Sequence, residues 1–334
     1  MERKLASIRK ITDIQPIPDA DSIEVVVVDG WKVVTKKGEF KIDDLCVYCE
    51  IDSLLPILSQ YEFLRKSSYK KMPDGSEGFR LKTIKLRGQV SQGLVLPLSV
   101  LPSGRSLYVG MDVTEVLSIT KYEPPIPASL SGQVKGLFPS FLQKTDEERV
   151  QNLADVYPFN KSLRFYVTEK LDGSSATFYF KDGVFGVCSR NLELKETPDN
   201  TFWKVARQLK IEELLKEFGQ NLCLQGELIG EGIQGNPYKI KGHTVKFFNA
   251  FDIDQQERMI LGGFLKIMDD LDLDFVPILD VKFGLPKTVE DMLKYAEGKS
   301  KLNPNTEREG VVVRSMDTKI SFKAISNKFL LDEK

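Results

Sequence analysis

The stretch that decides the fold is residues 168–175, which read TEKLDGSS. It lies between two apolar alternating runs, residues 163–167 and 176–180, so the pattern predicts a strand, a tight turn and a second strand. Lys170 then stands at the end of a strand, where its side chain is held in place. A lysine amine becomes a nucleophile when burial or nearby positive charge lowers its pKa from about 10.4. A divalent cation beside Lys170 would supply that charge, so we predict that Lys170 is a covalent nucleophile.

Length and composition indicate a globular protein of two domains. The chain has 334 residues, of which 41% are hydrophobic and 28% charged, and this balance excludes a disordered chain. No apolar run approaches the roughly 20 residues that cross a bilayer. The N-terminus, MERKLASIRK, lacks the apolar core of a secretory signal. We therefore expect an intracellular protein without a membrane partner.

The few cysteines and histidines limit the possible chemistry. Cys46 and Cys49 form a lone C-x-x-C in an apolar stretch, whereas a zinc site needs a second pair of ligands. The single histidine, His243, lies far along the chain and argues against a Ser-His-Asp mechanism. We favour buried strand cysteines over a zinc site.

The first 120 residues read as a small β-barrel. Five or six short β patterns, among them residues 79–85, are separated by Gly and Pro turns, and Asp29-Gly30 is typical of a hairpin turn. Residues 11–25 resemble the opening of tRNA-binding OB domains, so we predict an OB-like fold over residues 1–120 in preference to an SH3-like barrel.

A basic stretch in this domain suggests a nucleic-acid partner. Between positions 65 and 87 the sequence has eight basic residues and only two acidic ones. The basic residues are Arg65, Lys66, Lys70, Lys71, Arg80, Lys82, Lys85 and Arg87. The stretch would follow a phosphate backbone, or alternatively form a solvated loop and strand edge. On the first interpretation, the last four of these residues hold the duplex.

Three prolines at positions 124, 125 and 127 predict a linker over residues 121–137, which leaves residues 138–334 as the second domain. Thr145 and Glu148 form a capping box, so a helix should begin there with Arg149 in its first turn. One amphipathic helix is expected over residues 201–218. Further helices are expected at residues 260–271 and 289–295, and further strands at residues 184–187, 222–229, 246–253, 275–278, 309–314 and 319–325.

The Lys-x-Asp-Gly motif is weak alone and gains weight from the motifs that follow it in order. These are Ser189-Arg190-Asn191, Gly226-Glu227, Phe251-Asp252, Glu309-Gly310 with Arg314, and Ser321-Phe322-Lys323. The ordered set, over about residues 145–334, resembles the covalent nucleotidyltransferases, which include ATP-dependent DNA ligases, RNA ligases and mRNA capping enzymes.

Within that superfamily the chain most resembles ATP-dependent RNA ligases, because of residues 145–149 (TDEER), 225–230 (QGELIG) and 326–329 (SNKF). An OB-like domain placed first resembles the nick-sealing subgroup. DNA ligases and capping enzymes carry that domain after the last motif, and only 11 residues follow Lys323 here. Ser175 departs from the asparagine of many RNA ligases.

The resemblance implies an α+β fold, in which a ligase adenylation domain of antiparallel sheets flanked by helices follows a small all-β OB-like barrel. It also implies a role for each motif residue. Lys170 would attack the α-phosphate of ATP and form lysyl-AMP, and Phe251 would stack on adenine. Asp172, Glu227 and Glu309 would hold Mg²⁺ or Mn²⁺; alternatively, Glu227 or Asp172 would bind the ribose.

The remaining residues of the implied site contact phosphates or the nucleotide. Lys323 and Arg314 would contact the α-phosphate, Arg149 a phosphate of ATP or RNA, and Arg190 the nucleic-acid end. Glu169, Leu171, Gly173 and Val311 would complete the nucleotide-binding set.

We therefore expect a monomeric ATP-dependent RNA ligase. It would seal 3′-OH and 5′-phosphate ends in nicked duplexes with an RNA 3′-OH strand, through lysyl-AMP and an adenylylated 5′-phosphate. Two alternatives remain, a GTP-using capping-type enzyme and a non-catalytic RNA-binding protein. The intact Lys170, Glu227, Glu309 and Lys323 favour the ligase.

Overall fold

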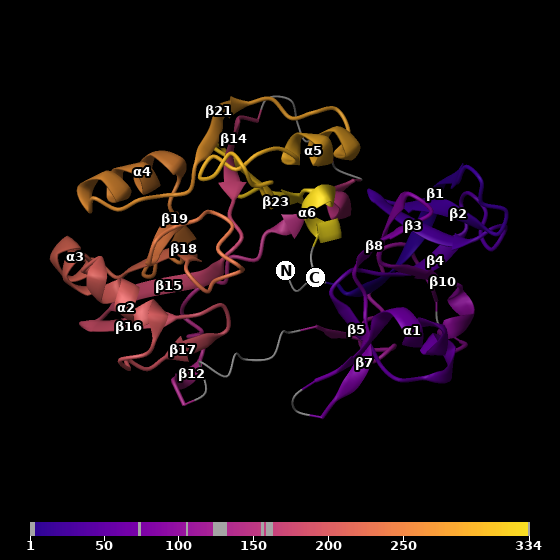
Figure 1. Ribbon diagram of the computed structural model, residues 1–334, viewed down its shortest axis with the longest axis horizontal. Coiled ribbons are helices and arrows are strands. Elements are labelled where there is room, and N and C mark those ends of the chain that lie inside the picture. The colour runs from indigo at the N-terminus through magenta and orange to yellow at the C-terminus, as the bar shows by residue number, and fades with distance from the viewer. Residues whose placement is uncertain are drawn as a thin grey trace.

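The computed structural model describes residues 4–72, 75–104, 106–122, 132–154, 157 and 163–332. Figure 1 shows two lobes side by side, with the N-terminal domain in indigo and purple on the right and the larger second domain on the left. Helix α6 (Asn327–Asp332), near the C-terminus, lies between the lobes. Among the described helices, none is long and apolar enough to cross a membrane.

The N-terminal domain is a nearly closed β structure, as predicted. A five-stranded sheet has the order β10-β4-β1-β2-β3 and a four-stranded sheet the order β11-β5-β7-β6, with the hairpin β8–β9 beside them. The strands are β1 (Ala6–Pro16), β2 (Ile23–Val28), β3 (Trp31–Lys36), β4 (Leu45–Cys49), β5 (Ser53–Leu55), β6 (Tyr69–Lys71), β7 (Glu77–Arg80), β8 (Thr83–Leu86), β9 (Gln89–Gln92), β10 (Leu94–Leu96) and β11 (Thr120–Lys121). The helical turns are η1 (Ser59–Leu64), α1 (Arg65–Ser68) and η2 (Leu98–Val100).

Local signals in this domain were confirmed, with one exception. The hairpin at Asp29-Gly30 pairs Val28 with Trp31, and Cys46 and Cys49 are buried free thiols. The single strand expected at residues 79–85 is wrong. Leu81 is buried; its carbonyl accepts from the Asp52 N–H and its N–H donates to the carbonyl of Ser53, the first residue of β5. The chain leaves one sheet there and enters the β8–β9 hairpin.

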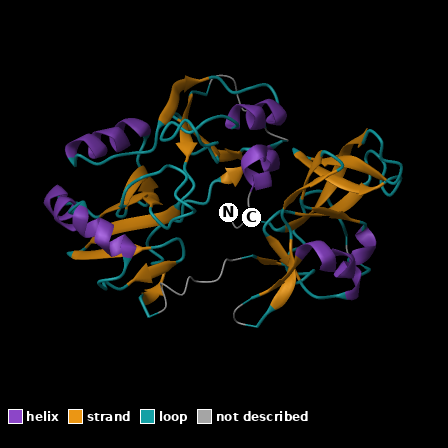
Figure 2. Ribbon diagram, in the orientation of Figure 1, coloured by secondary structure: helices purple, strands orange, loops and turns teal. Residues whose placement is uncertain are grey.

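The second domain is built on two sheets (Figure 2). A seven-stranded sheet has the order β12-β17-β16-β15-β18-β19-β20, and a five-stranded sheet has the order β13-β23-β22-β14-β21. Their strands are β12 (Val134–Leu137), β13 (Glu148–Arg149), β14 (Phe165–Lys170), β15 (Ser174–Lys181), β16 (Val184–Cys188), β17 (Leu192–Leu194), β18 (Leu222–Gly230), β19 (His243–Asp252), β20 (Glu257–Arg258), β21 (Ile278–Phe283), β22 (Gly310–Ser315) and β23 (Ser321–Ile325). The strand, turn and strand around Lys170 are thus confirmed as β14 and β15.

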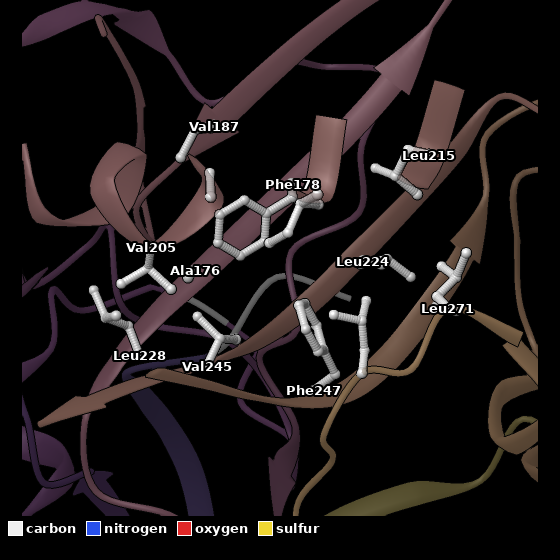
Figure 3. Close-up of a cluster of buried hydrophobic side chains, with 14 of the residues drawn as sticks. Ala176, Phe178, Val187, Val205, Leu215, Leu224, Leu228, Val245, Phe247 and Leu271 are labelled. Atoms are coloured by element: carbon white, nitrogen blue, oxygen red, sulfur yellow. The ribbon is translucent and has the colours of Figure 1, made fainter. Parts of the chain in front are cut away.

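Helices cover one face of each sheet. The helices are α2 (Thr201–Gln208), α3 (Ile211–Phe218), α4 (Leu261–Asp270) and α5 (Val289–Ala296). Residues of α2, α3 and α4 pack with Phe178, Leu224 and Phe247 of the seven-stranded sheet into one buried cluster (Figure 3). Helix α5 and the 3₁₀ helix η4 (Val150–Leu153) cover the five-stranded sheet. On the opposite face of the seven-stranded sheet, Tyr179, Cys223 and Phe251 belong to a second buried cluster. Lys170 lies on the face of the five-stranded sheet opposite to the buried Val167 and Val313.

Three predicted elements of this domain differ from the structure. No α-helix begins at Thr145, because Glu148 and Arg149 pair in parallel with β23 and the helical turn η4 follows them. The helix over residues 201–218 is two helices, since Lys210 takes a left-handed φ of 52° that a right-handed helix cannot continue. The strand expected at residues 275–278 begins instead at Ile278.

The two domains are in direct contact. The Gly30 N–H donates to the Gln151 carbonyl at 3.2 Å, and Trp31 Nε1 donates to Asn152 Oδ1 at 2.7 Å. Trp31 also belongs to a buried cluster that includes Ile325 and Leu330 of the second domain. The prolines of the expected linker lie outside the described residues, and β12, within its expected range, pairs with β17.

Candidate active site

Lys170 ends β14 and faces a carboxylate from the neighbouring strand. Lys170 pairs in register with Gly310, the first residue of β22. Glu309 lies just before that strand, and both oxygens of the Glu309 carboxylate are 2.8 Å from Lys170 Nζ. The Lys170 side chain is 28% exposed. Burial by itself lowers the pKa of Lys170, but the charges of Glu309 and Glu227 raise it more, so this pKa lies above its ordinary value. In this arrangement the amine is protonated and is not yet a nucleophile.

The charges of all three predicted metal ligands, Asp172, Glu227 and Glu309, act on this amine. Burial raises the pKa of Glu227 to about 8, and the charges of Glu309 and Asp172 add to that rise while Lys170 opposes it. Gly173 permits the close approach, because a Cβ there would lie 2.5 Å from the Leu228 carbonyl oxygen and 2.9 Å from Glu227 Cγ. The site thus carries more negative charge than Lys170 offsets.

Such an excess of carboxylates is a setting that favours a divalent cation. Within the described ranges, no group of three His, Cys, Asp or Glu side chains is placed to hold a metal ion by itself. An ion at Asp172, Glu227 and Glu309 would therefore complete its shell with phosphate oxygens and water, as Mg²⁺ commonly does.

The five-stranded sheet separates core residues from site residues by strand period. Val311, which we expected to contact the nucleotide, has its side chain fully buried in the core with Val167 and Phe322. Val312 lies on the face of Lys170 instead. Glu169 likewise points away from Lys170, and its Oε2 accepts from the Lys301 N–H. Leu171 is buried and packs with Ile229 and Tyr238.

Phe251, the predicted adenine partner, is buried in a hydrophobic cluster. Phe251 is 1% exposed and packs in a cluster with Leu142 and Tyr179, so a base cannot reach its ring. Phe248 is the aromatic beside the Lys170 turn, half-buried against the cluster that contains Leu171. Sequence reasoning did not identify Phe248, because a bulge in the β18–β19 pairing breaks the alternation of β19. Val245 and Phe247 face the helix-covered core before the bulge, and Ala250 faces it after the bulge.

Two of the predicted arginines are buried in ion pairs. Arg314 is 3% exposed, donates to Glu147 at 2.8 Å and donates to the Phe248 carbonyl at 2.6 Å, so in this structure it supports the aromatic residue. Arg149 lies in β13 and crosses to the N-terminal domain, where Asp52 is 3.6 Å away and the Trp31 ring centre 5.9 Å away.

The other two predicted cations converge on one carboxylate. Arg190 follows β16 and lies 3.0 Å from Asp146, and Lys323 of β23 lies 3.5 Å from the same oxygen. Asp146 and Glu147 belong to the segment that we predicted to start a helix, and their partners were not foreseen. The only sequence signal for them is the unbroken charge of residues 146–149.

The basic stretch of the N-terminal domain is partly used inside that domain. Arg80 stacks 4.2 Å from the Tyr122 ring centre and lies 3.4 Å from Asp52, and Arg65 is bound to Glu62. Lys85 and Arg87 are exposed near the tip of the β8–β9 hairpin. Of the four residues that we expected to hold a duplex, Arg80 is therefore a structural residue.

Comparison with known proteins agrees with this geometry. A family model for RNA ligase matches residues 163–327, and one for an OB-fold domain matches residues 5–98. Among solved structures, an apo mutant of Naegleria gruberi RNA ligase is 48% identical, with a TM-score of 0.92 over 98% of this chain and 97% of that one. A mutant of that ligase with ATP and Mn is 47% identical, and the ligase with PPi is 48% identical; each has a TM-score of 0.92 and covers 98% of both chains. No curated protein matched the chain.

Proposed function

This chain belongs to the RNA ligase family, and from that premise we propose that it seals 3′-OH and 5′-phosphate ends at nicks in duplexes with an RNA 3′-OH strand. It is an enzyme that uses ATP and a divalent metal to form phosphodiester bonds in RNA. The observation that carries the proposal is the Lys170 amine held 2.8 Å from Glu309, with Glu227 and Asp172 around it and Lys323 on the same face.

The first step that we propose is attack of Lys170 Nζ on the α-phosphate of ATP. The N–P bond forms as the P–O bond to pyrophosphate breaks, and the amine loses its proton. Mg²⁺ or Mn²⁺ held by Asp172, Glu227 and Glu309 would offset their charge and so lower the pKa of Lys170.

The chain's own groups position the nucleotide. Phe248 offers a flat ring for adenine, and Val312 offers an apolar contact on the same face as Lys170. Lys323 binds the α-phosphate, and Arg190, which shares the carboxylate of Asp146 with it, binds the RNA end. Phosphoryl transfer depends mainly on such positioning and charge neutralisation.

In the later steps AMP passes from Lys170 to the RNA 5′-phosphate, and the 3′-OH then attacks that phosphate and releases AMP. The exposed Lys85 and Arg87 of the β8–β9 hairpin contact the duplex backbone. We propose that one chain acts alone.

The test is incubation with α-labelled ATP and the metal ion, followed by denaturing electrophoresis. Label should remain on the wild-type chain and be lost from Lys170→Ala. It should persist in Lys266→Ala, a matched control on α4 whose partner is Asp270. Absence of label on the wild type, or label on Lys170→Ala, rejects the lysyl-AMP pathway. A nicked duplex with a 5′-phosphate should then be sealed faster than the same strands unannealed; equal rates would reject nick sealing.

A further inference from the structure

Three cations from three parts of the chain surround the carboxylate of Asp146. Lys121, from β11 of the N-terminal domain, is 3.4 Å from one oxygen. Arg190 and Lys323, from the second domain, are 3.0 Å and 3.5 Å from the other. Burial raises the pKa of Asp146, but the charges of Lys323, Arg190 and Lys121 lower it far more, so the carboxylate stays ionised.

Several cations that converge on one anion also suit a phosphate group. A phosphate, like a carboxylate, is held by charge-assisted hydrogen bonds from several Lys and Arg donors, and three converging cations exceed what one carboxylate needs. The Asp146 side chain is 48% exposed and open to solvent, whereas the Lys323 side chain is only 15% exposed. An ordinary surface ion pair would join one exposed cation to one carboxylate.

We propose that Lys121, Arg190 and Lys323 form a phosphate subsite shared by the two domains, and that Asp146 is its internal anion, which a substrate phosphate replaces. The inference rests on the proposed function, which brings phosphates to Arg190 and Lys323. It adds Lys121 and Asp146 to the site. The phosphate comes either from the nucleotide or from the RNA 5′ end, and the chemistry of the subsite is the same for both.

The subsite makes a directional prediction. Asp146→Asn keeps the shape of the side chain and removes its charge, so a phosphate no longer competes with an internal anion. Phosphate affinity should rise about tenfold, the scale of one charge–charge interaction at a few ångströms near a wet surface. If Asp146 only held the three cations in place, its loss would weaken phosphate binding.

The experiment measures binding to the full-length protein without ATP. The probes are pyrophosphate, a nicked RNA duplex with a 5′-phosphate, and the same duplex with a 5′-hydroxyl. The variants are Asp146→Asn, the double variant with Lys121→Met, and Asp317→Asn as the matched control, since Asp317 forms a surface ion pair with Arg164.

Asp146→Asn should bind at least one phosphate probe about tenfold more tightly and the 5′-hydroxyl duplex within twofold of wild type. A gain with pyrophosphate alone identifies a nucleotide phosphate, and a gain with the 5′-phosphate duplex alone identifies the RNA end. Lys121→Met should remove most of the gain, and Asp317→Asn should show none. The proposal is overturned if neither phosphate probe binds more tightly, if the hydroxyl duplex gains equally, or if Lys121→Met leaves the gain intact. Labelling of wild-type protein by ATP, measured separately, shows whether the proposed function itself has failed.

Discussion

Replacing Gly30 with alanine should loosen the contact between the two domains. Gly30 lies at the turn between β2 and β3, where an added Cβ would be 2.8 Å from Val289 Cγ1 and 2.9 Å from Gln151 Cα. The valine methyl could rotate away, but Gln151 Cα is backbone and fixed by its neighbours. The hairpin would therefore have to move back from η4 and weaken the Gly30–Gln151 hydrogen bond of 3.2 Å.

The expected cost follows from the size of this overlap. An added methyl group in a well-packed contact typically destabilises a protein by about 1–3 kcal/mol. The movement would also strain the adjacent bond from Trp31 Nε1 to Asn152 Oδ1, at 2.7 Å. Arg149, two residues before Gln151, is held by Asp52 and the Trp31 ring. The family resemblance implies that Arg149 binds a phosphate of ATP or RNA. Misplacing such a group by about 1 Å can lower a rate by up to roughly a hundredfold, so we expect labelling at limiting ATP to slow by tenfold or more.

Thermal unfolding and the rate of labelling by ATP test this expectation. Gly30→Ala should lower the Tm by a few degrees and slow labelling. The matched control is Gly284→Ala, where an added Cβ meets no heavy atom within 4 Å. If Gly30→Ala unfolds and labels like Gly284→Ala, the docking of the hairpin does not position Arg149 and the reasoning is wrong.

Three other predictions test separate parts of the site. Phe248→Leu should raise the KM for ATP about tenfold by removing a stacking contact, whereas Phe251→Leu should lower stability by about 1 kcal/mol and leave KM unchanged; the reverse pattern would restore Phe251 as the adenine contact. Arg314→Met should destabilise the protein at pH 7 by roughly 3–5 kcal/mol, because it leaves Glu147 buried without its main partner. Burial raises the pKa of Glu147, but Arg314 and the Ser321 hydrogen bond lower it below the ordinary 4.5. The contribution of the pair is thus complete above that value and lost as the pH falls through the lowered pKa, so unfolding curves of variant and wild type should converge in acid. Removal of divalent ions with EDTA should abolish labelling by ATP and Mn²⁺ should restore it; labelling that survives EDTA would contradict the role given to the three carboxylates.

Local patterns predicted the strands that carry the site better than they predicted which side chains line it. The β14–β15 pair follows from alternation and an Asp-Gly turn, both of which act within a few residues. Val311, Val312 and Val313 are all apolar, so alternation could not show which of them faces the core. The bulge between β18 and β19 depends on the pairing of two strands, and a single strand does not reveal it.

The helix expected at Thr145 failed for a different reason. A capping box is a local signal worth about 1 kcal/mol. Here it competes with the pairing of Glu148 and Arg149 with Phe322 and Lys323, more than 170 residues later. Contacts between residues far apart in the sequence decide the local structure whenever the local preference is small.

Four cations near the Lys170 site and the domain contact are matched by carboxylates of the chain. Lys170 faces Glu309, Arg149 faces Asp52, and Asp146 faces both Arg190 and Lys323. A phosphate that binds to any of these four cations therefore replaces an anion that is already there. The gain per phosphate contact is then smaller than the number of cations suggests, because each contact first breaks an ion pair. The logarithm of the RNA-binding constant should therefore fall with the logarithm of salt concentration by less than about 0.9 per cation that contacts a phosphate. Asp146→Asn should make this slope steeper.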